Sequence, residues 1–405
     1  MGMTLAKKVF TRNLEACVDQ IIETVGRKIV FGMPLALGKP NHLANALYQR
    51  ARIDPSINLT IITALSLEKP AASSSLEKRL LNPIVDRLWN GFIEFDYVKD
   101  LRLNQLPDNV HIHEFFTKAG GYLNTPYAQQ HYISTNYTHA VRDLLDNGLN
   151  VIGNLVAPHP DGRTDRVSLS CNPDLALEAV EKLAEQADKK FMVVGQINSN
   201  LPYMYGDAEM SVNNYDLILN DPEYDFPLFC VPKASVSAAD HMIGLNVSTL
   251  IKDGGTLQIG IGSLGDAIAS SMIMRHKNNA TYQQAIKKLN ILDRYHGLID
   301  RIGGTRPFEK GLYGSTEMLV DVFIHLYKKG ILKRRVYDHA GIQELLNQDR
   351  ISPKISLETI DAFVENHVIH QRITPKDFSL LKKYGILSPK ISFRDHRLIY
   401  RNRSY

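Results

Sequence analysis

The first half of the chain alternates short apolar runs with segments of helical periodicity. Residues 172–190 repeat apolar positions at helical spacing after Asn172, a residue type that favours the start of a helix. Such alternation of strand and helix predicts βαβ units and a largely parallel sheet, and hence an α/β fold. The apolar runs, each typical of a buried strand, are residues 27–32, 58–65, 149–157 and 189–198.

The same pattern divides the chain into two domains. Residues 85–101, which carry Trp89, predict one continuous helix. Prolines and acidic residues at 220–233 predict a linker, so we expect one domain at 1–230 and a second at 231–405. The second domain is short of strands, and we expect its sheet to be incomplete. Its predicted elements are a helix at 237–254, a strand at 255–262, helices at 266–279 and 317–332, a polar, turn-rich segment at 276–310 and a tail at 351–405 that is helical and then irregular.

Charge and composition exclude several classes of protein. The net charge of +4, from 47 basic and 43 acidic side chains, is too small to predict nucleic-acid binding. No apolar run approaches the roughly 20 residues of a membrane helix, and the N-terminus lacks a signal-peptide core. Cys17, Cys171 and Cys230 lie far apart, which fits reduced thiols rather than a disulfide framework or a zinc site. We therefore expect a cytoplasmic protein that binds neither nucleic acid nor membranes.

A glycine-rich turn is the strongest local motif. An apolar strand is predicted to run into Gly260, Gly262 and Gly265, where a helix follows and backbone N–H groups can approach a ligand closely. The spacing satisfies the GxGxxG fingerprint of nicotinamide-binding folds, but the acidic residue expected about 20 positions later is missing. The same N–H groups could instead stabilise a developing negative oxygen. A tight turn without a ligand is the third interpretation.

A second candidate is Glu317, in the stretch GLYGSTEML, where the pattern predicts the start of a helix with Ser315 or Thr316 as its cap. An acidic residue in the first turn of a helix commonly does no more than offset the partial positive charge there. The same setting favours the ionised carboxylate that a nucleophile requires. The residue alone leaves both interpretations open.

Histidines offer a third candidate. His111 and His113 share one face of an expected strand and are suited to metal binding. No third ligand stands at a sensible spacing from them, so we expect no metal.

Several longer stretches, taken in order, carry a resemblance to a known family. They are VAPHPDGRTDRVSLSCNPDLALEAVEKL, VVGQINSNLPYMYGDAEMSVNNYDLIL and PLFCVPKASVSAADHMIGLNVSTLIKDGGTLQIGIGSLGDAI. Together with GLYGSTEML they resemble the acetyl-CoA hydrolase/transferase family, relatives of 4-hydroxybutyrate and succinyl-CoA:acetate CoA-transferases. Tyr313, Gly314 and Ser315 depart from the compact form of the family's glutamate motif, which has histidine in this turn. The family's later glycine-rich loop, of gly-x-gly-gly-gln type, has no match before Tyr405, so we expect a fragment of a longer protein.

The resemblance implies two related CoA-transferase-like domains with largely parallel sheets, the second incomplete, and an active site between them. It implies an acyl-CoA hydrolase or CoA-transferase in which Glu317 is the nucleophile and a glutamyl-CoA thioester the intermediate. Coenzyme A would be a cosubstrate, acyl-CoA and a small carboxylic acid or water the reactants, and a homodimer the assembly. The implied oxyanion and CoA-binding residues are Gly260, Gly262, Ser263 and Gly265, and the implied pocket residues are Asn198, Asn200, Pro202 and Gly206.

Two alternatives from other classes stay open. One is a nicotinamide-dependent oxidoreductase that uses GIGSLG, and the other is a catalytically silent binding protein of the same fold. The sequence does not distinguish transfer from hydrolysis, nor does it indicate the acyl chain.

Overall fold

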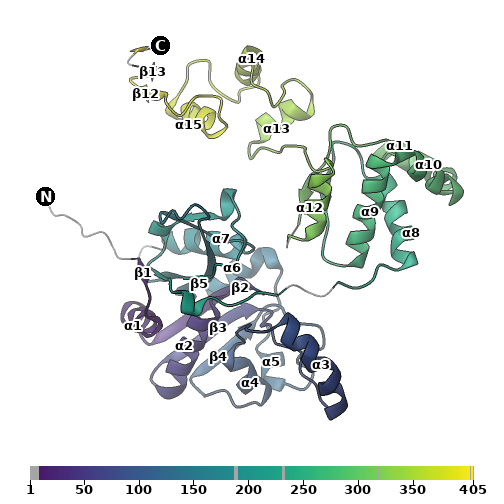
Figure 1. Ribbon diagram of the computed structural model, residues 1–405. Helices are drawn as coiled ribbons and strands as arrows, with labels where there is room; N and C mark the ends of the chain where they lie inside the picture. The colour runs from purple at the N-terminus through teal and green to yellow at the C-terminus, as the bar shows by residue number, and fades with distance from the viewer. Residues whose placement is uncertain (1–8, 187–189, 230–232, 317–318, 402, 405) are drawn as a thin grey trace. The chain divides into compact units, whose positions relative to one another are not determined.

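The chain folds into two compact units, residues 1–232 and residues 233–405. None of the helices in the described part of the chain is long and apolar enough to cross a membrane. The computed structural model (Figure 1) describes residues 9–186, 190–229, 233–316, 319–401 and 403–404.

A largely parallel sheet forms the centre of unit 1. Its main path has the order β1-β9-β7-β5-β2-β3-β4, with parallel pairing throughout, and β6 and β8 join it by antiparallel pairing. The α/β fold with a parallel sheet is therefore confirmed. The strands are β1 (Phe10–Thr11), β2 (Lys28–Leu35), β3 (Asn58–Ala64), β4 (Val110–Glu114), β5 (Val151–Pro158), β6 (Arg166–Ser168), β7 (Met192–Ile197), β8 (Glu209–Ser211) and β9 (Leu217–Leu219).

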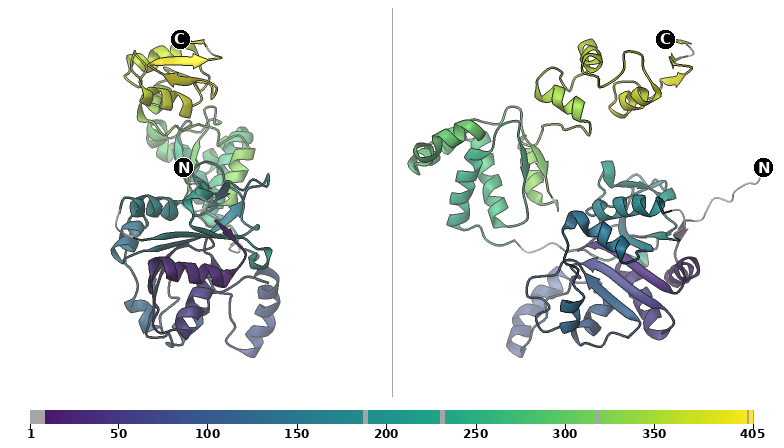
Figure 2. Two further views of the ribbon diagram at one scale, coloured as in Figure 1. Left: turned by 90° about the vertical axis from the view of Figure 1, so that its left-hand side faces the viewer. Right: turned by 180° about the vertical axis from the view of Figure 1, so that it is seen from behind.

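Helices cover both faces of this sheet, as Figures 1 and 2 show. Along β2, Phe31 joins the core that α1, α2 and α4 supply on one face. The next position, Gly32, faces Leu144 and Leu149 of the opposite layer, where a Cβ atom would lie 2.5 Å from Leu149. This two-residue alternation explains the continuous apolar run of the strand, because both of its faces are buried. The helices are α1 (Leu14–Val25), α2 (Asn41–Ile53), α3 (Ser75–Leu88), α4 (Asp96–Arg102), α5 (Pro126–Gln130), α6 (Ala140–Asp146) and α7 (Pro173–Ala184).

The single helix predicted over residues 85–101 is wrong. Helix α3 ends at Leu88, and α4 begins only at Asp96. Between them, Phe92 is buried against the rings of Phe226 and Phe229, while Gly91 takes a φ of 75°. Burial of an aromatic ring outweighs the helical tendency of the local sequence, which is a weak preference per residue.

The linker predicted over residues 220–233 contains the boundary between the two units, at residues 232 and 233, but its middle packs against unit 1. Phe226 is 2% exposed and belongs to a cluster with Phe92 and Leu155 of unit 1. The Asn198 amide donates to the carbonyl oxygen of Phe226 at 2.9 Å. Pro222 begins a short 3₁₀ turn, and the segment is held to unit 1 mainly through the buried Phe226.

Unit 2 begins with two helices around a small parallel sheet. Strands β10 and β11 pair in parallel, and the predicted strand at 255–262 is reduced to three residues. The polar segment at 276–310 contains two helices that the sequence did not reveal, with Tyr282 and Ile299 among their buried residues. The elements are α8 (Ala238–Leu250), β10 (Thr256–Gln258), α9 (Ser263–Lys277), α10 (Asn279–Lys288), α11 (Ile291–Ile302), β11 (Tyr313–Ser315) and α12 (Asp321–Lys328).

The C-terminal part of unit 2 repeats one helix-and-turn pattern. Leu345, Phe363 and Leu381 are buried at an 18-residue spacing, each accepting a backbone hydrogen bond from the residue five positions later. The irregular tail that we predicted is wrong, because antiparallel strands β12 (Ser392–Arg394), β13 (Arg397–Tyr400) and β14 (Arg403–Ser404) close the chain. The repeating helices are α13 (Ala340–Asn347), α14 (Leu357–Glu365) and α15 (Pro375–Lys383).

Candidate functional site

The glycine turn connects β10 directly to α9. Ile259 is buried and its N–H donates to the carbonyl oxygen of Ser315 at 3.2 Å. Gly260 and Gly262 are exposed, and Gly262 has a φ of 136°, a value that side chains other than hydrogen rarely permit. Helix α9 begins at the next residue, so the unpaired N–H groups of its first turn lie beside the turn.

Close packing explains the third glycine. A Cβ atom on Gly265 would lie 2.8 Å from the carbonyl oxygen of Gly260 and 3.0 Å from the Ile259 side chain. A Cβ atom on Gly260 would meet nothing within 4 Å. The helix therefore approaches the turn closely only because position 265 carries no side chain.

This contrast predicts opposite outcomes for two alanine substitutions. Gly265→Ala is expected to lower the free energy of unfolding of unit 2 by about 1–3 kcal/mol, because the turn must move away from the helix. Gly260→Ala, the matched control, is expected to be neutral or slightly stabilising. Hydrogen exchange of the α8 and α9 amides measures both effects. Equal exchange in the two variants would contradict the packing argument.

The end of β11 reaches the same place as the glycine turn. The register pairs Gln258 with Ser315, and the hydroxyl of Thr316 donates to the carbonyl oxygen of Ile259 at 2.9 Å. Glu317, the predicted nucleophile, is the next residue along the chain and lies outside the described residues. The carboxyl ends of β10 and β11 thus bring the glycine motif and the start of the glutamate motif together.

The helix after the glutamate motif begins later than the sequence predicts. Helix α12 starts at Asp321 with Val320 at its N-cap position, so the predicted caps Ser315 and Thr316 are wrong. Ser315 belongs to β11 instead. The helix ends at Lys328, and Gly330 follows with a φ of 75°, a conformation that commonly ends a helix.

Ser263, a predicted oxyanion or CoA residue, is the first residue of α9. Its hydroxyl interacts with Asp240, in the first turn of the neighbouring helix α8. The pKa of Asp240 lies below its ordinary value, chiefly because the backbone N–H of Ser237 donates to the carboxylate at 3.0 Å. The starts of α8 and α9 are therefore tied together beside the glycine turn.

Lys233 is a charged residue near this turn that sequence reasoning missed. Its ammonium contacts Asp321 Oδ2 at 2.7 Å and Asp266 Oδ2 at 3.6 Å. The hydrogen bond to Asp321 raises the pKa of Lys233 and lowers the pKa of Asp321. Each aspartate stands in the first turn of a helix, which is the only signal that the sequence offers for such a contact.

The predicted pocket residues of unit 1 follow strand β7 and form a hydrogen-bonded turn. Asn198 is fully buried, and its Oδ1 accepts the backbone N–H of Asn200 at 2.9 Å. The carbonyl oxygen of Pro202 accepts the hydroxyl of Ser170 at 2.8 Å. Gly206 has a φ of 77° and begins a short 3₁₀ turn. Their amides and carbonyls hold this turn in place, and their contribution to a pocket stays a prediction.

A buried pair of opposite charges lies at the carboxyl ends of β2, β3 and β4. Lys39 donates to the carbonyl oxygens of Ala64 at 2.6 Å and Leu65 at 2.8 Å. Glu114 accepts the N–H of Ser66 at 3.1 Å, and its Oε2 meets no donor among the described residues. Burial lowers the pKa of Lys39 to about 7, against the opposing effect of the Glu114 charge. Burial raises the pKa of Glu114.

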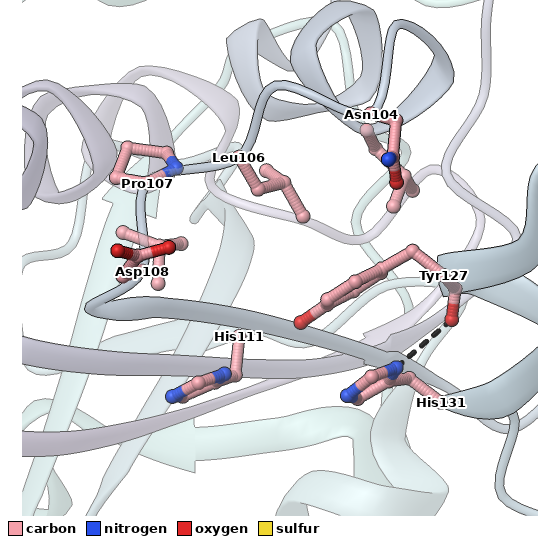
Figure 3. A pocket seen from close by; sticks show the side chains of 9 residues that line it. Asn104, Leu106, Pro107, Asp108, His111, Tyr127 and His131 are labelled. Carbon is pink, nitrogen blue, oxygen red and sulfur yellow. Dashed lines mark hydrogen bonds between the residues drawn. The ribbon is translucent and has the colours of Figure 1, made fainter.

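A cavity of about 360 Å³ lies at the opposite, amino end of β4 (Figure 3). His111 and His131 line it, and the rings of His131 and Tyr127 stack with centroids 3.8 Å apart. Burial, with the neighbouring imidazoles, lowers the pKa of His113. Across the described ranges, no group of three or more potential ligands has an arrangement that could hold a metal.

The fold around the glycine turn differs from a nicotinamide site. A dinucleotide-binding fold places a strand after the helix, with an acidic residue at its end. Here α9 is followed by α10 and α11, both helices. The next strand, β11, therefore begins only at Tyr313, about 50 residues after the glycine turn, whereas the ribose-binding acid is expected about 20 residues after it.

Comparison with solved structures defines the class of the fold. RipA from Yersinia pestis aligns over 80% of this chain and 59% of its own, with a TM-score of 0.50 and 17% identity. A point mutant of RipA aligns over the same shares with a TM-score of 0.52 and 16% identity. At these identities the likeness concerns the fold alone, an α/β architecture with a parallel sheet. No family model matches the chain.

Comparison with curated proteins gives the relatives. The 4-hydroxybutyrate coenzyme A transferase of Clostridium kluyveri is 32% identical over 93 residues, or 23% of this chain and 20% of that protein. The succinyl-CoA:cyclohexane-1-carboxylate CoA transferase of Geobacter metallireducens is 27% identical over 146 residues, or 36% of this chain and 30% of that protein. The chain is therefore a relative of the CoA-transferases of the acetyl-CoA hydrolase/transferase family over part of its length, and the matched segments span under one third of these two proteins.

Proposed function

We propose that the chain carries the glutamate-bearing part of an acyl-CoA hydrolase or CoA-transferase. The observation that supports this most is the hydrogen bond from Thr316 to Ile259, which brings the residue before Glu317 to the glycine turn. A nucleophile at the next position would then be a neighbour of a set of backbone donors at the carboxyl edge of one parallel sheet, the usual place for a site in such folds. Unit 1 would be the N-terminal domain of this enzyme.

The proposed reaction begins with the carboxylate of Glu317 attacking the thioester carbonyl of acyl-CoA. Negative charge then develops on the carbonyl oxygen, where N–H groups of Gly262, Ser263 and Gly265 would stabilise it. Collapse expels the CoA thiolate and leaves a mixed anhydride between the acyl group and the enzyme. The thiolate next attacks the glutamyl carbonyl, which releases the carboxylic acid as its anion and forms the glutamyl-CoA thioester.

The second half decides between transfer and hydrolysis. An acceptor carboxylate that attacks the thioester takes up the CoA by the same steps in reverse, and Glu317 is regenerated. Water that attacks the thioester releases CoA and makes the enzyme a hydrolase. No metal is needed in either case, since the thiolate is a good leaving group. The turn at Asn198, Asn200, Pro202 and Gly206 would contribute to the substrate pocket, and a cytoplasmic homodimer would be the working form.

Acyl exchange tests this function directly. The 405-residue chain is mixed with acetyl-CoA and propionate, and the CoA species are separated by chromatography. We expect propionyl-CoA if the chain transfers CoA, or free CoA alone if it hydrolyses the ester. Absence of both products, with no thermal shift by CoA or acetyl-CoA, would contradict the proposal. A thermal shift without turnover would favour the silent binding protein, and a fluorescence change of reduced nicotinamide cofactor would favour the oxidoreductase.

A further inference from the structure

We propose that Lys233 is a positioning residue for Glu317, because it holds the start of helix α12 against the first turn of α9, beside the glycine turn. This inference rests on the proposed function, because it assigns Lys233 a role in presenting that glutamate. It concerns contacts inside unit 2 only.

The residues that flank the Glu317 segment contact the β10–α9 connection on one side and, through Lys233, the first turn of α9 on the other. On the preceding side, Thr316 donates to the carbonyl oxygen of Ile259 at 2.9 Å. On the following side, Asp321 accepts from Lys233 Nζ with both carboxylate oxygens, at 2.8 and 2.7 Å. Lys233 in turn contacts Asp266 of α9 at 3.6 Å. Thr316 and Asp321, which flank this segment, are therefore each held by a side-chain contact, and the contact of Asp321 is made by Lys233.

Charge explains why this tie depends on the lysine. Asp266 and Asp321 are two carboxylates that approach one ammonium, so the cluster carries one positive and two negative charges. Without the ammonium, the carboxylates would repel each other, and the starts of α9 and α12 would separate. The side chain of Lys233 is 58% exposed and that of Asp321 48% exposed, so the stability gained is small. Its effect is expected on position rather than on folding.

Substitution of Lys233 by methionine tests this role, with Lys310→Met as the matched control. Lys310 is an exposed lysine of the same unit and pairs with Asp349 at 2.9 Å. In Lys233→Met, we expect the amide of Ile259, which donates to Ser315, to exchange faster with deuterium. Lys310→Met should leave that exchange at the wild-type rate, and Lys233→Arg should restore most of the protection because it keeps the charge.

The chemical readout is the rate at which acyl-CoA forms the glutamyl adduct. We expect kcat to fall roughly 10- to 100-fold in Lys233→Met with KM little changed, since small misplacement of a reacting group has effects of this size. Asp321→Asn should give the same loss, and the double variant should be no slower than either single variant. Melting temperatures should stay close to that of the wild type.

The two proposals fail in distinguishable ways. If the wild type forms no adduct but Lys233→Met still exposes the Ile259 amide, the function is wrong and the tie remains. If the wild type forms the adduct, and Lys233→Met matches it in both rate and exchange, the positioning role is overturned. An equal loss of kcat and of Ile259 protection in Lys310→Met would also overturn it, because removal of any exposed lysine of unit 2 would then have the same effect.

Discussion

Replacing Glu317 with glutamine is expected to abolish the covalent enzyme–CoA adduct and to lower turnover by on the order of a thousandfold or more. Glutamine has nearly the same size as glutamate but presents an amide nitrogen, which does not attack a thioester at a useful rate. The donors of the glycine turn would remain, so binding of acyl-CoA should be retained. Borohydride treatment after incubation with acetyl-CoA measures the adduct, because it reduces a glutamyl thioester to an alcohol and inactivates the enzyme permanently.

The control for this experiment is Glu309→Gln. Glu309 is an exposed glutamate of the same unit and lies before the amino end of β11. Its backbone N–H donates to the carboxylate of Asp253. This variant should form the adduct at the wild-type rate. If Glu317→Gln retained full turnover, Glu317 would not be the nucleophile, and the glycine turn would need another partner. Unchanged melting temperatures in both variants would separate a chemical loss from unfolding.

The strands of unit 1 could be predicted from sequence because their pattern is local. Strand β2 is apolar at every position from Ile29 to Phe31, and burial on both faces requires that run. The helix over 85–101 could not be predicted correctly, since the burial of Phe92 depends on Phe226, more than a hundred residues later. Helices α10 and α11 were missed because the segment is polar and only a few of its residues, such as Tyr282, reach a core.

In the candidate site, too, the features with a local pattern could be predicted and those that depend on distant residues could not. The glycines of the turn could be found because a φ of 136° at Gly262 and the close contact at Gly265 demand that residue type. A strand–helix–strand order implies that β10 and β11 pair in parallel, and this pairing brings the glycine turn next to the start of the glutamate motif. Lys233 could not be found, because its partners Asp266 and Asp321 are far from it in sequence and become adjacent only when the starts of their helices meet.

Below about pH 7, where Lys39 carries its proton in the folded protein, replacing Lys39 with methionine is expected to destabilise unit 1 by roughly 3–5 kcal/mol. Glu114 would then be buried without its counter-charge, and the carbonyl oxygens of Ala64 and Leu65 would lose the ammonium that they share. Trp89, the chain's single tryptophan, belongs to unit 1, so its fluorescence in urea follows the unfolding of this unit. Lys99→Met, an exposed lysine of α4, should change the free energy by less than about 0.5 kcal/mol.

The shifted pKa values of Lys39 and Glu114 also predict the direction in which stability changes with pH. The pKa of Lys39 is about 7 in the folded protein, below its ordinary value of 10.5. Between these values the unfolded chain binds more protons, so the wild type should gain stability from Lys39 as pH rises through this window. Lys39→Met removes that gain and leaves Glu114, whose raised pKa makes stability fall as pH rises through it. If Lys39→Met had the same urea midpoint and the same pH profile as the wild type, the proposed interaction between Lys39 and Glu114 would be contradicted. Partial recovery in Lys39→Met/Glu114→Gln would support it, since that variant buries neither charge.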